Sequence, residues 1–354
     1  MAPIADTQSS TLRTVVSQLV GADVTSVDQV AGGRNSQVFK VVCGVSDCYA
    51  VKHYFRHPTD QRDRLGVEFS SLEFLWSNGV RSIPRPVAAD RESQWAVYEW
   101  IDGGKLPAEQ VTGSEIDDAV SFLARLHDLA GNESSRHLPA ASDACFFPQT
   151  ILDKIRGRLS RLESVENAGV QSEGLRCFLA GEFQPFLSEA EEWCRERYAG
   201  SGRSYDAELP WSHRTLSPSD FGFHNALRRS DGRIVFVDFE YFGWDDPAKT
   251  VSDFLLHPAM ELSMGLKHRF VESIFSRFRE SGDLASRVKS LYPLYGLTWC
   301  LILLNEFLPE HLLRREFAGA SERRRDAQQA VQLAKARLML AKVRGEYEHF
   351  PYHG

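Results

Sequence analysis

The chain has 354 residues, with 41 lysine and arginine residues against 48 aspartate and glutamate residues, which gives a formal net charge of −7. Hydrophobic residues make up 43% of the sequence, so the composition excludes a disordered, collagen-like or small disulfide-stapled protein. The acidic balance argues against a dedicated nucleic-acid-binding protein, which usually shows a basic domain. At roughly 100–200 residues per domain, the length predicts about two domains.

The six cysteines are scattered and form neither a CxxC pair nor a zinc-type spacing, which is typical of reduced thiols in a cytoplasmic protein. The N-terminus lacks the charged and apolar segments of a secretory signal. The most apolar stretch, 291–308, is interrupted by Pro293 and Gly296 and is shorter than the roughly 20 residues that a membrane span needs. We therefore expect a buried core helix there, and a soluble cytoplasmic protein with no membrane and no nucleic-acid partner.

The chain up to Gly103 reads as a small, β-rich lobe. Two β-branched and aromatic runs, 37–42 and 49–54, flank a turn and predict a hairpin. The spacing of apolar residues predicts an amphipathic helix over 62–77. Residues 95–101 predict a further strand that leads into Asp102 and Gly103. We expect residues 1–103 to form an N-terminal lobe with a hinge near 98–103.

The chain after residue 103 reads as mainly helical. We expect helices over 113–129, 149–164, 175–198, 247–256, 261–280, 284–307 and 321–343. One β-hairpin, formed by 226–229 and 233–237, interrupts them, because Asp-Gly between two apolar runs is a strong hairpin signal. The layout predicts an α+β fold of two lobes, with a large, mainly helical lobe over residues 104–354.

Two motifs of the N-terminal lobe could contact phosphate. Gly32 and Gly33 precede Ser36 and the hairpin, and adjacent glycines let backbone N–H groups approach a phosphate closely, although a plain turn is the alternative. Lys52 lies in the middle of an apolar strand, where it needs an anion unless the strand is an exposed edge. Glu68 lies on the core-facing side of the predicted helix, and a Lys52–Glu68 pair would direct the lysine toward phosphates.

A third motif carries the strongest signal. Asp220 and Asn225 have the spacing D-x-x-x-x-N, and Asp238 directly follows the second strand of the later hairpin. Phosphoryl transfer to a hydroxyl needs a carboxylate that accepts the hydroxyl proton and oxygen ligands for Mg²⁺. These three residues therefore predict a phosphotransfer site.

Asp220, Phe221 and Gly222 also imitate the metal-binding DFG triplet of protein kinases. That interpretation would need a catalytic aspartate upstream of the triplet. The only nearby candidate segment, His213-Arg214-Thr215, has a threonine at the position where the aspartate is needed. It would also leave the later asparagine and aspartate without roles, and we reject it.

Seven segments in succession resemble the aminoglycoside phosphotransferase / choline kinase family, whose members are small-molecule kinases with the two-lobed protein-kinase-like fold. The segments are GGRNSQVFKV, YAVK, EFSSLEFL, VYEWIDG, LARLH, SPSDFGFHNAL and VDFEYFGWDDP. The resemblance covers nearly the whole chain, and VDFEY is especially similar to the choline/ethanolamine kinase branch. It implies ATP or GTP and Mg²⁺ as cofactors. It also implies a small-molecule hydroxyl acceptor such as an aminoglycoside, an amino alcohol or a sugar.

The resemblance also implies the roles of individual residues. Asp220 is the expected catalytic base, and Asn225 and Asp238 are the expected Mg²⁺ ligands. The expected nucleotide contacts are Gly32, Gly33, Ser36, Lys52 and Glu68 around the phosphates, and backbone groups of Glu99 and Ile101 at the nucleobase. In one departure, Pro218 stands where the family usually has a histidine two residues before the catalytic aspartate. We expect altered support for the loop rather than lost chemistry.

Two other functions compete with a small-molecule kinase. A protein kinase needs a long segment after its metal-binding aspartate, but here Asp246 and Pro247 predict a helix start soon after Asp238. A pseudokinase, which would bind nucleotide without turnover, has only Pro218 in its favour. For the active enzyme we expect a monomer or a homodimer.

Overall fold

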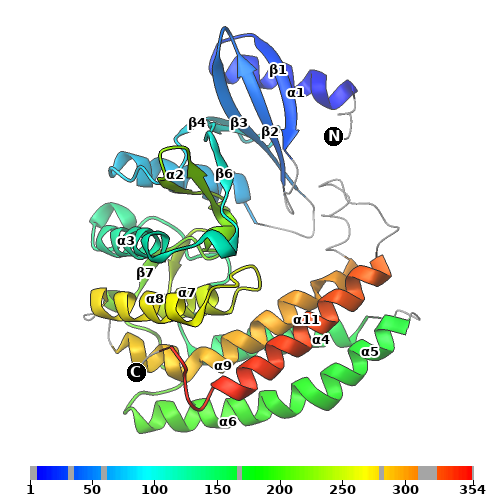
Figure 1. The fold of residues 1–354 in the computed structure, drawn as a ribbon, viewed down its shortest axis with the longest axis vertical. Coiled ribbons are helices and arrows are strands. Elements are labelled where there is room, and N and C mark those ends of the chain that lie inside the picture. Colours follow the sequence, from blue (N-terminus) through cyan, green and yellow to red (C-terminus); the bar gives the residue numbers. More distant parts are fainter. Residues whose placement is uncertain are drawn as a thin grey trace. The chain divides into compact units, whose positions relative to one another are not determined.

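The structure is a computed structural model that describes residues 6–30, 36–56, 62–165, 170–278, 283–309 and 325–352 (Figure 1). The chain divides into two compact units. Within the described residues, unit 1 contains residues up to 107 together with 218–243, and unit 2 contains 108–217 and the rest of the C-terminal part. Strands dominate the N-terminal region and helices the C-terminal part, which confirms the predicted α+β class.

Unit 1 is built on a five-stranded antiparallel sheet in the order β1–β2–β3–β5–β4. The strands are β1 (Val24–Val30), β2 (Ser36–Cys43), β3 (Asp47–Tyr54), β4 (Pro86–Asp90) and β5 (Trp95–Glu99). The predicted hairpin is confirmed as β2 and β3. Its register pairs Val42 with Cys48 and Cys43 with Asp47, and both cysteines are free thiols.

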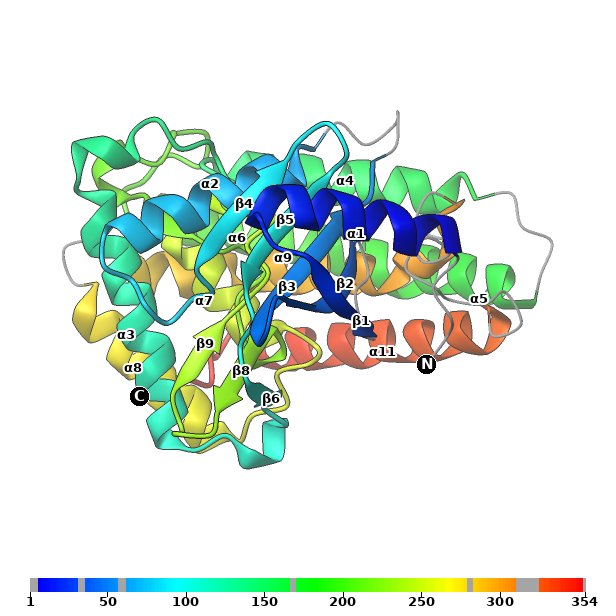
Figure 2. The same ribbon diagram turned by 90° about the horizontal axis from the view of Figure 1, so that it is seen from above.

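The two faces of this sheet have different roles. Helix α1 (Asp6–Val20) crosses one face (Figure 2), where its Leu12 and Val16 pack in a cluster with Phe39 and Val51. Because side chains alternate along a strand, Lys52, Tyr54 and Tyr98 lie on the opposite face. That face is covered by α2 (Arg64–Ser77), which confirms the helix predicted over 62–77. The sequence patterns had not predicted α1 or β4.

A smaller sheet in unit 1 joins segments that are far apart in the sequence. It has the order β6–β8–β9, from β6 (Gly103–Lys105), β8 (Ala226–Arg229) and β9 (Ile234–Phe236), and it contains the predicted second hairpin. A Cβ on Gly103 would lie 2.6 Å from the backbone oxygen of Arg228, so this pairing requires glycine. It places residues 218–243 in unit 1, while the lobe boundary at residue 103 stays a prediction.

Unit 2 is a helical unit arranged around α9 (Leu284–Leu303), which contacts α4, α6, α7 and α11. The other helices are α3 (Gly113–Ala130), α4 (Pro148–Glu163), α5 (Val170–Phe178), α6 (Gln184–Gly200), α7 (Pro247–Leu256), α8 (Met264–Arg277) and α11 (Arg325–Glu346). A π-helical turn, Leu179–Phe183, joins α5 to α6 within the single helix predicted over 175–198. Strands β7 (Thr215–Ser217) and β10 (Gly243–Asp245) form a two-stranded sheet.

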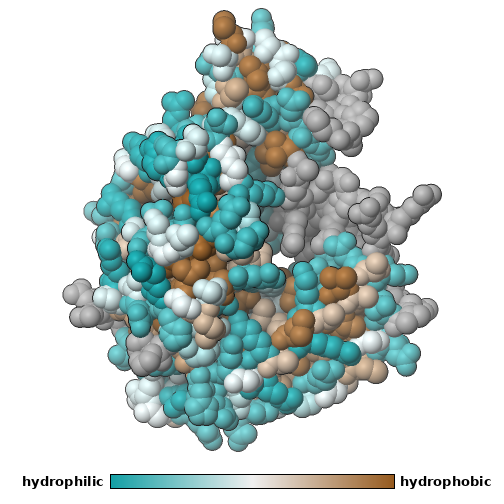
Figure 3. Space-filling view, in the orientation of Figure 1, coloured by the Kyte–Doolittle hydropathy of each residue, from teal (hydrophilic) through white to brown (hydrophobic). Residues whose placement is uncertain are grey.

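The apolar stretch predicted as a core helix is the buried α9 with its 3₁₀ extension Leu304–Phe307. Gly296 lets α11 approach closely, because a Cβ there would lie 2.3 Å from Cγ2 of Val343. Among the described helices, none is long and apolar enough to cross a membrane. Figure 3 shows hydrophobic spots among hydrophilic surface over α11, where Val331 and Leu338 are exposed, and single exposed apolar side chains are ordinary.

The start of α7 rests on a buried aspartate. One carboxylate oxygen of Asp246 accepts hydrogen bonds from the backbone N–H of Ala248 at 2.8 Å and from Arg287 at 3.0 Å, and Pro247 is the first helical residue. Both charged side chains are buried. The helix start predicted at Asp246 and Pro247 is therefore confirmed.

We expect Asp246→Ala to lower the free energy of unfolding by about 3–5 kcal/mol, because it leaves the buried Arg287 without this carboxylate and removes the helix cap. Asp246→Asn keeps a side-chain oxygen that can cap the helix, so it should lower the free energy of unfolding by less than Asp246→Ala. Denaturant unfolding of both variants measures the difference. Losses below about 1 kcal/mol in both would contradict the assignment.

Candidate active site

Lys52 is a buried cation held between two carboxylates. Its Nζ donates to Glu68 Oε2 and to Asp238 Oδ1, both at 2.7 Å. The side chains of Lys52 and Glu68 are 11% and 4% exposed, whereas that of Asp238 is 40% exposed. Burial opposes the charge, but the carboxylates of Asp238 and Glu68 outweigh it and raise the pKa of Lys52 well above its ordinary value. The structure thus brings three predicted residues together, and Lys52 does not lie on an exposed edge strand.

Glu68 binds more partners than the sequence predicted. Its Oε2 also accepts a hydrogen bond from Tyr54 Oη at 2.7 Å, and its Oε1 accepts one from the backbone N–H of Phe239 at 3.3 Å. Tyr54 and Tyr98 share a further hydrogen bond of 2.7 Å, and Tyr98 must be its donor because the Tyr54 proton goes to the carboxylate. Burial raises the pKa of Glu68, and the Lys52 ammonium opposes this rise. Glu68 therefore fixes both the lysine and the backbone directly after Asp238.

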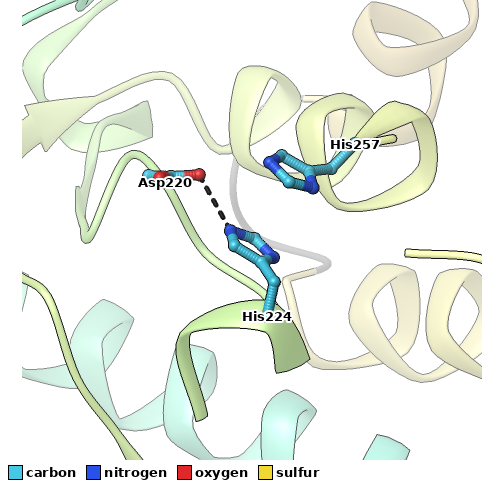
Figure 4. A group of neighbouring side chains, drawn as sticks. All are labelled: Asp220, His224 and His257. Atoms are coloured by element: carbon cyan, nitrogen blue, oxygen red, sulfur yellow. Dashed lines mark hydrogen bonds and ion pairs between the residues drawn. The ribbon is translucent and has the colours of Figure 1, made fainter. Parts of the chain in front are cut away.

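Asp220 lies in a short loop whose side chains contact one another. Asn225 Nδ2 donates to the backbone oxygen of Asp220 at 3.0 Å and lies 3.3 Å from its Oδ2. His224 Nε2 lies 3.0 Å from Oδ1 of the same carboxylate (Figure 4). The buried rings of Phe221 and Phe223 anchor the loop on either side. The structure thus brings Asp220 and Asn225 together, and it adds His224, to which the sequence analysis gave no role.

The chain segments that carry the two predicted metal ligands are joined by a backbone hydrogen bond in unit 1. The backbone N–H of Val237 donates to the backbone oxygen of Asn225 at 2.9 Å, and Asp238 is the next residue. Asp238 has a φ of 71°, an uncommon conformation for a residue other than glycine that often marks functional sites. Because the Asn225 amide nitrogen faces Asp220, its amide oxygen is the atom available as a ligand. One carboxylate and one amide oxygen fit Mg²⁺, which prefers oxygen ligands.

Glu240 adds a second buried carboxylate that the sequence analysis did not single out. Its Oε1 lies 3.6 Å from Nε of the equally buried Arg64. Burial and the nearby Asp238 raise the pKa of Glu240 to about 7, although Lys52 and Arg64 oppose the rise. Glu240 thus titrates near neutral pH, unlike an exposed glutamate.

Three of the remaining predicted contacts, Ser36, Glu99 and Ile101, lie in or just after strands of the large sheet. Ser36 is buried at the start of β2, and Ile101 is buried just after β5. The N–H of Glu99 donates to the backbone oxygen of Arg85 at 2.8 Å, and its carboxylate accepts a 2.7 Å hydrogen bond from Arg229. Gly32 and Gly33 lie outside the described residues. The nucleotide-binding roles of these five residues stay predictions.

A comparison with models of protein families assigns the chain to a family. The model of the phosphotransferase enzyme family, APH, matches residues 26–283. The chain belongs to this family. It is therefore a phosphotransferase, which confirms the predicted enzyme class and the resemblance stated above. No curated protein sequence matches the chain.

Solved structures of three small-molecule kinases match nearly the whole chain. Choline kinase LicA from Streptococcus pneumoniae has 17% identity and a TM-score of 0.60, with 95% of this chain and 100% of that chain covered. Spectinomycin phosphotransferase APH(9)-Ia, solved with ADP and spectinomycin, has 12% identity and a TM-score of 0.65, with 97% and 99% covered. The gentamicin complex of APH(2")-IIa has 16% identity and a TM-score of 0.62, with 97% of each chain covered. These matches confirm the predicted protein-kinase-like fold.

The raised pKa of Glu240 predicts a pH-dependent stability. Between pH 4.5 and about 7 the folded chain holds a proton on Glu240 that the unfolded chain has lost, so this group lowers the free energy of unfolding as pH rises through that window. Across the whole window, the free energy of unfolding falls by about 3 kcal/mol because of this group.

Glu240→Gln should remove this loss. The free energy of unfolding of the variant, relative to wild type, should therefore rise between the two ends of the window. Urea unfolding without nucleotide or Mg²⁺ measures both proteins, and parallel pH profiles would contradict the assignment.

Proposed function

We propose that this phosphotransferase is a Mg²⁺-dependent kinase that transfers the γ-phosphate of ATP or GTP to a hydroxyl of a small molecule. The observation that carries the proposal is the buried Lys52, bonded at once to Glu68 and Asp238. Asp220 and Asn225 lie in the same unit, and their loop is hydrogen-bonded to the residue before Asp238.

The nucleotide is proposed to bind at Lys52. Among the described residues, Lys52 uses two of its three donors on Glu68 and Asp238, which leaves one for a phosphate oxygen. Asn225 Oδ1 and the Asp238 carboxylate would hold Mg²⁺, which supplies neutralisation of the phosphate charge when bound. The solved complex of the spectinomycin phosphotransferase with ADP supports a nucleotide as the donor.

The acceptor is proposed to deliver its hydroxyl proton to Asp220. This carboxylate is 35% exposed, so a substrate can reach it, and the bonds from His224 and Asn225 hold it in place. The names of the similar structures support a small hydroxylated acceptor, since they include choline kinases, an ethanolamine kinase, a spectinomycin phosphotransferase and a complex of APH(2")-IIa with gentamicin. An amino alcohol, an aminoglycoside and a sugar are the acceptor classes to test.

A substrate screen tests the function. The chain is incubated with Mg·ATP or Mg·GTP and single acceptors, namely choline, ethanolamine, spectinomycin, gentamicin and simple sugars, and release of ADP or GDP and the phosphorylated product are measured. We expect one acceptor class to give product. Labelling of serine or threonine in a mixture of proteins, with no small-molecule product, would overturn the proposal in favour of a protein kinase.

Asp220→Asn tests whether Asp220 is the catalytic base. It should lower kcat by roughly 10²–10⁴-fold, because the amide oxygen does not accept a proton, while nucleotide affinity stays near the wild-type value. Steady-state kinetics and nucleotide titration separate the two quantities. A variant with more than about a third of the wild-type kcat would show that Asp220 is not the base.

Asp238→Ala and Asn225→Ala compare the two proposed metal ligands. Asp238→Ala should abolish the Mg²⁺ dependence of nucleotide binding, since it removes the charged ligand and one partner of Lys52. Asn225→Ala removes a neutral ligand and should weaken Mg²⁺ binding less. Titration of Mg²⁺ against a fluorescent nucleotide measures both, and unchanged binding in the two variants would remove both residues from the metal site.

A further inference from the structure

The Asp220 carboxylate is contacted by two side chains that follow it in the loop. His224 Nε2 lies 3.0 Å from Oδ1, whereas Asn225 Nδ2 lies 3.3 Å from Oδ2 and makes its shorter bond, 3.0 Å, to the backbone oxygen. On the preceding side, Pro218 contributes only a backbone oxygen, which accepts from the N–H of Asp220, and its ring has no hydrogen-bond donor. Of these two side-chain contacts of the carboxylate, the one from His224 is the shorter.

The protonation of this contact follows from its chemistry. An ionised carboxylate only accepts hydrogen bonds, so His224 must carry a proton on Nε2. The loop holds the ring in place, because Phe223 is buried next to it, Asn225 follows it, and the His224 side chain is only 15% exposed. Figure 4 shows the ring directed at the carboxylate oxygen.

We propose that His224 is a positioning residue for the phosphotransfer reaction: it fixes Asp220 through Oδ1, so that Oδ2 is the oxygen that accepts the proton of the acceptor hydroxyl. The inference rests on the proposed function of Asp220 as the base. A carboxylate rotates about its last side-chain bond unless partners hold it, and the longer contact from Asn225 holds only the other oxygen. Small errors in the position of a catalytic group cost much of the rate, so this one hydrogen bond should affect turnover more than binding.

Three substitutions of His224 test the proposal. His224→Ala removes the donor and should lower kcat roughly 10- to 100-fold, while KM for the nucleotide changes less than about twofold. His224→Gln places an amide nitrogen near the position of Nε2 and should restore most of kcat. His224→Asn places its amide nitrogen near Nδ1, too far from Oδ1, and should behave like the alanine variant. His137→Ala, a change of an exposed histidine in unit 2, is the matched control and should behave as wild type.

The measurements use Mg·ATP alone, with water in place of the acceptor, and then the acceptor that the screen identifies. Thermal unfolding of each variant reports whether the fold is retained. A wild-type kcat in folded His224→Ala would overturn the proposal, and so would equal kcat values for the glutamine and asparagine variants. An unfolded alanine variant leaves the comparison of these two amides as the deciding test.

A double-mutant cycle with Asp220→Asn separates this inference from the proposed function. If His224 acts through Asp220, His224→Ala should cause no further loss of kcat in the Asp220→Asn background. Full activity of Asp220→Asn itself would defeat the assignment of the base, whatever the histidine does. An inactive Asp220→Asn together with a fully active His224→Ala would defeat only the role of His224.

Discussion

One buried ammonium group connects the parts of unit 1. Lys52 on β3, Glu68 on α2 and Asp238 after β9 come from segments that are far apart in the sequence, and they meet at two contacts of 2.7 Å. An ammonium removed from water costs several kcal/mol unless carboxylates compensate it, and here Glu68 and Asp238 together compensate the charge of Lys52. The same constraint fixes where a metal ligand can be, because Asp238 is at once a partner of Lys52 and the proposed ligand of Mg²⁺.

The alternation of side chains in the large sheet gives unit 1 both a core and a site. One face supplies the apolar cluster under α1, and the other presents Lys52, Tyr54 and Tyr98 to α2. A shift of β3 by one residue would exchange the two faces and bury the lysine against α1, where the described cluster contains only apolar side chains. The hairpin register of β2 and β3 is therefore a condition for the chemistry as well as for stability.

The sequence predicted the parts of the site that depend on local pattern. The hairpin, the helix with Glu68 and the spacing of Asp220 and Asn225 are local features, and each is present in the structure. Helix α1 was not predicted because its few apolar residues lie among polar ones. These apolar residues form a recognisable core face only when they pack against the sheet. The bonds of Tyr54 to Glu68 and of His224 to Asp220 depend on distances that no periodicity encodes.

The groups proposed for phosphate, metal and proton chemistry all belong to unit 1, where ion pairs join Lys52 to Glu68 and Asp238 and a backbone hydrogen bond joins Asn225 to Val237. The similar structures share the fold at 12–17% identity, yet their names describe a choline kinase, a spectinomycin phosphotransferase and a complex with gentamicin. Acceptor choice therefore varies while the fold stays, as expected when function lies in particular residues placed on a common fold. In this chain His224 contacts the Asp220 carboxylate from the following side of the loop, and the backbone oxygen of Pro218 accepts from the N–H of Asp220 on the preceding side. Under the proposed mechanism, this contact holds the Asp220 carboxylate through the oxygen that does not take the proton and leaves the other oxygen for the acceptor hydroxyl.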